Sequence, residues 1–208
     1  MGAPLKRVAL AAAALLLPFP AAPAAAQGAL CPSAADAARI TAAFAARPAP
    51  LPMMAAPKLA LTEAAVSAGA PRDMTLGVDG SHFDAVWRSL GAWGETLVLI
   101  RKGGHVFEIR SAIPGGLPSK RSRFFNLDEA TLSGHLRPDL IAAIDVQRIP
   151  SADGLARGIG FHDAAGEMIF GIFISGEGRE PSAAQVAAFE ATWSLLASLP
   201  RRCAAPAP

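Results

Sequence analysis

The amino-acid sequence predicts an α+β fold, a largely antiparallel β-sheet meander with small N-terminal helices and a C-terminal helix packed on the sheet. Two observations indicate this class. Short runs rich in Val, Ile, Leu and Phe recur over residues 95–175 and are separated by turn sequences, whereas capped helical patterns occur only before and after that region. Helices that lie at the ends of a run of strands are typical of α+β proteins.

The first 26 residues have the features of a secretory signal peptide. Lys6 and Arg7 form a positive start, residues 8–17 form an apolar stretch, and the three alanines at 24–26 provide a small-residue cleavage site. The apolar stretch is too short to span a bilayer and no later run is long enough, so we expect no stable membrane insertion. The mature chain is expected to be exported to the periplasm.

The mature chain that would remain is neutral. The signal segment holds two of the 19 Lys and Arg residues and none of the 17 Asp and Glu residues, which leaves 17 of each sign. A neutral chain without a basic stripe does not have the charge pattern of a nucleic-acid-binding protein. Its length of about 180 residues is sufficient for one hydrophobic core.

Both cysteines of the sequence belong to the mature chain, Cys31 near its start and Cys203 near its end. In an oxidising compartment they are expected to form a disulfide that ties the two termini together, and two unpaired thiols are the alternative. No Cys-x-x-Cys pair is present, so neither a thiol redox site nor a zinc site is indicated.

The region 27–75 is predicted to be a helical N-terminal subdomain with a linker. Ser33 can cap its first helix, Asp36 follows three residues later as in a capping box, and the prolines of residues 47–52 end that helix. The predicted helices cover 33–46, 53–58 and 62–67.

The main domain is predicted over residues 76–200, with a tail at 201–208. It opens with a helix at 81–91, in which Phe83, Val86, Trp87 and Leu90 share one face, as expected of core residues. It closes with a helix at 181–199. Between these two helices the predicted strands are 95–101, 105–113, 124–127, 140–149, 155–162 and 168–175.

Common catalytic motifs are absent from the sequence. It contains no Gly-x-Ser-x-Gly, no His-Glu-x-x-His, no P-loop and no Gly-x-Gly-x-x-Gly after a strand. The four histidines, at 82, 105, 135 and 162, are too scattered to form a metal cluster by spacing. No conventional nucleophile is therefore indicated.

Several short segments between residues 82 and 195 nevertheless occur together in one known family. They include HisPheAspAlaValTrp (82–87), TrpGly (93–94), IleProGlyGly (113–116), PhePheAsnLeu (124–127), SerGlyHisLeu (133–136) and GlnValAlaAlaPheGlu (185–190). In this order and spacing they resemble the ChuX/HutX family of haem-utilisation proteins, which is similar to one half of the HemS-type haem-handling proteins. The resemblance implies a haem-binding α+β protein, commonly a homodimer, with haem b or a related tetrapyrrole as its ligand.

The resemblance also implies candidate ligands of the haem iron. The chain has no tyrosine, so a ligand must come from His, Met or Cys. His135 matches the histidine of the family's Gly-His step after the aromatic-Asn-Leu strand, and it is the expected axial ligand. A histidine that some members carry on the first hairpin aligns here with Arg101, while His105 lies across the turn and is the candidate second ligand.

The rest of a haem site needs apolar walls and cations for the two propionates. Phe124 or Phe125 is the candidate wall, and Arg121, Arg123 or Lys120 the candidate partner of the propionates. The family's Gly-His-Gly ahead of this strand is replaced here by residues 121–123, Arg-Ser-Arg.

Each of these residues also has a structural alternative. His135 would be a hydrogen-bonded side chain at a junction of strand and loop, and the basic cluster would be a solvated loop. His82, His105 and His162 would be surface or hydrogen-bonded residues.

Three functions remain open at this point. The leading hypothesis is an exported, non-catalytic haem carrier. A haem-degrading enzyme of HemS type is the second, although the sequence has no reductase or flavin motif. The third is a member of the fold that has lost haem binding and acts as a small-ligand or structural module, as the replaced histidines would allow.

Overall fold

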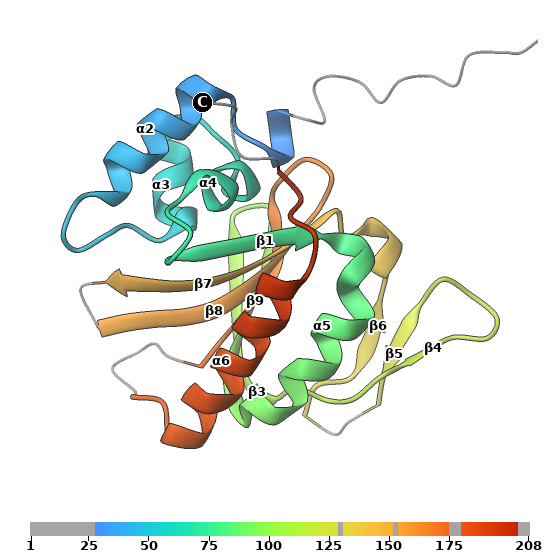
Figure 1. Ribbon diagram of the computed structural model, residues 1–208. Coiled ribbons are helices and arrows are strands. Elements are labelled where there is room, and N and C mark those ends of the chain that lie inside the picture. The colour runs from blue at the N-terminus through green and yellow to red at the C-terminus, as the bar shows by residue number, and fades with distance from the viewer. Residues whose placement is uncertain (1–27, 129–130, 152–153, 175–179, 204–208) are drawn as a thin grey trace, which may run out of the picture.

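The computed structural model describes residues 28–128, 131–151, 154–174 and 180–203. The segment interpreted as a signal peptide lies outside these residues. Within them the predicted α+β class is confirmed: a six-stranded antiparallel sheet and a three-stranded sheet are combined with helices at both ends of the chain (Figure 1).

Short helices precede the sheets, as predicted. Two of them begin with a side-chain cap: the Oγ atom of Ser33 accepts from the backbone N–H of Asp36, and that of Thr62 accepts from Ala65. The helices are α2 (Ala34–Phe44), α3 (Pro52–Leu59) and α4 (Glu63–Gly69).

The large sheet has the strand order β1-β7-β8-β9-β2-β3, and every pairing in it is antiparallel. Two hairpin-connected groups, β2-β3 and β7-β8-β9, therefore meet at the β9-β2 pair, and β1 is added at the far edge. The strands are β1 (Thr75–Asp79), β2 (Glu95–Lys102), β3 (His105–Ala112), β7 (Ala143–Ser151), β8 (Gly154–His162) and β9 (Met168–Phe173).

The small sheet has the order β4-β5-β6, with β4 (Leu117–Pro118), β5 (Phe125–Leu127) and β6 (Gly134–Leu136). The predicted strand at 124–127 is thus present, but it pairs outside the main meander. A 3-10 turn at Pro138–Leu140 delays the next strand, so that β7 begins at Ala143 rather than at residue 140.

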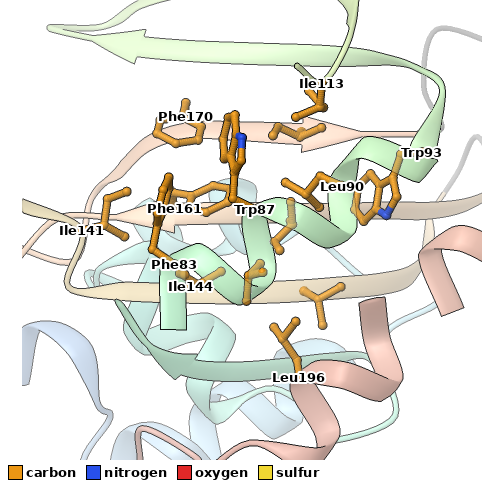
Figure 2. Close-up of a cluster of buried hydrophobic side chains, with 14 of the residues drawn as sticks. Phe83, Trp87, Leu90, Trp93, Ile113, Ile141, Ile144, Phe161, Phe170 and Leu196 are labelled. Carbon is orange, nitrogen blue, oxygen red and sulfur yellow. The ribbon is translucent and has the colours of Figure 1, made fainter. Parts of the chain in front are cut away.

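Two helices cover one face of the large sheet, α5 (Phe83–Leu90) and α6 (Ala183–Ser198) (Figure 1). The core between them and the sheet is rich in aromatic rings, several of which are labelled in Figure 2. Phe83 stacks on Trp87 with ring centroids 5.4 Å apart, and Phe161 stacks on Phe170 at 4.5 Å. The helical face predicted for residues 81–91 is therefore a core face.

The opposite face of the large sheet carries the N-terminal helices. A second hydrophobic cluster joins α2, α3 and α4 to Met74 and to Ile149 of β7. The predicted disulfide between Cys31 and Cys203 is present, with Cα atoms 5.7 Å apart, and it fastens the segment before α2 to the end of the chain after α6. Among the described residues, no helix is both long enough and apolar enough to cross a membrane.

Candidate functional site

An apolar cavity of about 310 Å³ lies where α5, β2 and β9 meet the small sheet. Trp87 contributes one wall from α5, Ile100 and Phe170 contribute a second from the large sheet, and Leu127 and Leu136 close it from the small sheet. A volume near the lower end of the range for small-molecule sites, about 300–1,000 Å³, suits part of a large flat ligand rather than the whole of it.

Strand periodicity explains why these side chains meet. Val98 and Ile100 alternate with residues of the other face of β2, and Leu127 and Leu136 project from the inner face of the small sheet. The Trp87 ring is fixed because its Nε1–H donates to the carbonyl oxygen of Pro114 at 3.1 Å.

Of the described residues that line the cavity, His135 and Arg137 carry ionisable groups. Alternation along β6 puts His135 on the face opposite Leu136, and Arg137 directly follows this strand, which is an edge strand of the small sheet. His135 is exposed and Arg137 half-buried. The two polar side chains therefore belong to the rim of the cavity, while its interior is apolar.

The imidazole of His135 has two neighbours on the outer face of the small sheet. Its Nδ1 atom lies 2.9 Å from Oδ1 of Asn126, the residue opposite it on β5. Its ring centroid lies 5.6 Å from that of Phe124, which is 39% exposed. An imidazole and an aromatic face are thus presented together to solvent beside the cavity.

A carboxylate joins two guanidinium groups at the same rim. Arg137 binds both carboxylate oxygens of Asp139 at 2.7 Å, and Arg123 approaches Asp139 at 3.5 Å. The hydrogen bonds from Arg137 are the main reason why the pKa of Asp139 is lowered from 3.8 to about 2. The Arg137 guanidinium also lies 5.8 Å from the centre of the Phe124 ring. Two cations and one anion leave this rim with a net positive charge.

The structure thus brings three of the sequence-predicted site residues together, namely His135, Phe124 and Arg123. Arg121 is exposed in the same loop, where its backbone N–H donates to Ser119 Oγ at 3.2 Å. Phe125 instead points into the core and is 4% exposed, with its ring edge-on to Phe83 at 5.2 Å.

The two hairpin residues lie elsewhere. Arg101 follows the cavity-lining Ile100 on β2, so its side chain projects to the opposite face, where it forms an ion pair with the buried Glu63 of α4. His105 is exposed at the start of β3 opposite Lys102, and it does not line the cavity.

Sequence reasoning missed Arg137, and it missed that Trp87 lines the cavity as well as packing in the core. Arg137 follows His135 by two residues, so the alternation of an extended segment already placed the two side chains on one face. Trp87 was assigned to the core, and it is 3% exposed, but the same side chain also lines the cavity. Among the described residues, no group of three or more His, Cys, Asp or Glu side chains is placed to hold a metal ion.

Comparison with known proteins yields matches of sequence and of fold. Residues 76–192 match the sequence model of the family described as haem utilisation ChuX/HutX. The chain is 31% identical over 148 residues to the intracellular heme transport protein HutX of Vibrio cholerae, a match that covers 70% of this chain and 76% of that protein.

Solved structures also share the fold, among them the following two. The heme-binding protein ChuX superposes with a TM-score of 0.65 at 22% identity, over 78% of this chain and 97% of that one. The heme-degrading enzyme ChuS of Escherichia coli O157:H7 superposes with a TM-score of 0.61 at 19% identity, over 76% of this chain but 48% of that one. The chain therefore has the fold of about half of ChuS.

Proposed function

Because the chain belongs to the ChuX/HutX haem-utilisation family, we propose that it binds haem b at the mouth of the cavity between its two sheets and carries it as cargo. The observation that supports this most directly is the arrangement of an imidazole, an aromatic ring and two guanidinium groups around one apolar opening. Haem offers a partner to each of them: an iron atom, a flat apolar face and two propionates.

His135 is the proposed axial ligand of the iron. It is an exposed histidine at the rim of the cavity, and the chain contains no tyrosine that would serve in its place. Cys31 and Cys203 are joined to each other, which leaves no thiol to attach a haem covalently and favours the non-covalent b type. Tetrapyrroles with the same carboxylates remain a competing cargo.

The propionates would bind the arginines of the rim. Arg137 and Arg123 share Asp139 as their partner, and a bound carboxylate would take over part of these interactions through charge-assisted hydrogen bonds. Arg121 and Lys120 lie in the loop before β5 and extend the positive rim. The exposed ring of Phe124 would cover part of the porphyrin surface.

A carrier is favoured over an enzyme by the curated relative, because HutX is described as a transport protein. Likeness to ChuS, at 19% identity, extends to the fold alone. Haem degradation would also require an open coordination position and an electron donor. A measurement of Soret absorbance in the presence of ascorbate distinguishes the two: a carrier keeps its bound haem, while an enzyme loses the band.

The proposed compartment differs from that of HutX, whose description is intracellular. Export to the periplasm is supported by the signal-like residues 1–26 and by the disulfide, since such bonds persist in oxidising compartments.

A homodimer is also proposed, through the edge strand β3. Eight residues long, this strand has no partner on its outer side in the part of the chain that the structure describes, and Val106 and Phe107 are 51% and 60% exposed on it. Sedimentation of the mature chain beside a Phe107→Lys variant tests this assignment.

The test of haem binding is a haemin titration of residues 27–208, followed by absorption spectroscopy, for the wild type, His135→Ala and the control His82→Ala. We expect a saturable Soret shift in the wild type and in His82→Ala, and a weaker, altered shift in His135→Ala. An unchanged spectrum and affinity in His135→Ala would exclude His135 as the ligand. No saturable shift in the wild type would reject the function.

A further inference from the structure

We infer that Asn126 is a positioning residue, which holds the His135 imidazole in the tautomer that leaves Nε2 free to bind iron. The iron-binding part of this inference rests on the proposed function. The hydrogen bond itself is a property of the chain without ligand, and it can be measured separately.

The geometry of the pair carries the argument. Asn126 and His135 are directly opposite each other on the antiparallel strands β5 and β6, with 2.9 Å between Asn126 Oδ1 and His135 Nδ1. An amide oxygen only accepts hydrogen bonds, so with the amide in this orientation the proton of the neutral imidazole lies on Nδ1. A neutral imidazole protonated at Nδ1 has its lone pair on Nε2, the one ring nitrogen then able to bind a metal.

The backbone on which Asn126 sits is firmly anchored. Its neighbours Phe125 and Leu127 are 4% and 7% exposed, and both project into the core from the inner face of β5. Alternation then fixes Asn126 on the outer face, opposite His135. On its other side the imidazole meets the Phe124 ring at 5.6 Å. The imidazole is thus bounded on two sides before any ligand arrives.

The reverse orientation of the amide makes the opposite prediction. If the amide NH₂ group donated to Nδ1, the proton of the ring would lie on Nε2 and that nitrogen would not bind iron. The tautomer of His135 therefore decides between a positioning role for Asn126 and an ordinary surface hydrogen bond.

Partners that orient a metal-binding histidine have a characteristic effect when they are removed. Loss of such a group lowers metal affinity by about 10- to 100-fold. Asn126→Val removes the acceptor but keeps a side chain suited to a strand, whereas Asn126→Asp keeps an acceptor. We expect the first variant to lower haem affinity by about this factor and the second to retain it.

The deciding experiment is ¹⁵N NMR of the neutral His135 imidazole in the ligand-free mature chain, beside haemin titrations of the same proteins. The wild type and Asn126→Asp should hold the Nδ1–H tautomer, and Asn126→Val should shift toward Nε2–H. Asn126→Asp serves as the folding control because it preserves the hydrogen bond.

An Nε2–H tautomer in the wild type would overturn the inference. So would an Asn126→Val chain whose His135 keeps the tautomer of the wild type. A wild type that holds the Nδ1–H tautomer but gives no Soret shift would instead reject the proposed function. The two failures are therefore distinguishable.

Discussion

The imidazole of His162 contacts the carboxylate of Asp145 on the face of the large sheet that α4 covers, and the two residues are 2% and 3% exposed. Ser67 of α4 donates to the other carboxylate oxygen of Asp145 at 3.1 Å. Gly160 makes room for the pair, because a Cβ atom at that position would lie 2.9 Å from His162 Nε2. The sheet thus binds its N-terminal helices through a buried polar group as well as through apolar packing.

Removal of one partner from this pair should destabilise the protein strongly. We expect Asp145→Ala to lower the free energy of unfolding by about 3 kcal/mol, because it leaves polar groups buried without a partner. Urea denaturation followed by circular dichroism measures the change. The control is Asp84→Ala, at an exposed position 3.9 Å from Arg88, for which we expect less than about 0.5 kcal/mol. Similar effects of the two substitutions would contradict this account.

The disulfide is expected to be a second large contribution to stability. It joins residues that are 172 apart in sequence, and the loop-entropy relation gives about 5 kcal/mol for so long a loop. Reduction should therefore move the urea midpoint of the wild type to a lower concentration. The same reductant should not affect a Cys31→Ser/Cys203→Ser chain, which reports any other effect of the reagent. A wild-type midpoint that does not move would show that the bridge contributes little.

Arg202 is a partly buried arginine next to the disulfide in sequence. Its guanidinium donates to the carbonyl oxygens of Leu30 and Ala64, both at 3.1 Å, and burial lowers its pKa. The carboxylates of Asp145 and Asp79 oppose that shift. Because Arg202 precedes Cys203, the disulfide and the buried charges hold the same end of the chain against the N-terminal helices.

Elements with a strong local signal were predictable from the sequence, and those defined by long-range pairing were not. Helix α5 has an apolar face at helical spacing, and the hairpin β2-β3 has a Gly-Gly turn between apolar runs. Strand β1, by contrast, is five residues long with a central Gly77, and it pairs with β7 far along the chain. Its apolar pattern is too short to be recognised alone.

The site was predictable to a similar extent. His135 was singled out by the family resemblance, and Arg137 follows from alternation once a strand is placed there. Phe124 and Phe125 illustrate what sequence leaves open: adjacent residues of a strand face opposite sides, and only the tertiary structure shows that Phe125 enters the core while Phe124 is exposed.

The ionisation of Asp139 provides a pH test of the rim. Its pKa of about 2 in the folded chain lies below the ordinary value of 3.8. The pairing with arginine therefore stabilises the fold at pH values above 3.8, and this stabilisation is lost as the pH falls through about 2. We expect an NMR titration of this carboxylate to show the low midpoint, and Arg137→Gln to move it upward. Arg88→Gln, which alters a distant exposed arginine, should not move it. A wild-type midpoint near 4 would refute the pairing in solution.

The rim arginines should recognise the carboxylates of the cargo. A charge-assisted hydrogen bond contributes about 1.5–3 kcal/mol, so Arg137→Gln is expected to weaken haemin binding by at least about tenfold. The dimethyl ester of haemin, which lacks the anionic propionates, should bind this variant and the wild type almost equally. Asp139→Asn should strengthen haemin binding, because it frees Arg137 and Arg123 from their shared carboxylate. Fluorescence quenching titrations of Trp87 and the other tryptophans measure these affinities, with Arg88→Gln as the control. Equal losses for haemin and its ester in Arg137→Gln would mean that this arginine supports the fold of the rim and does not bind the propionates.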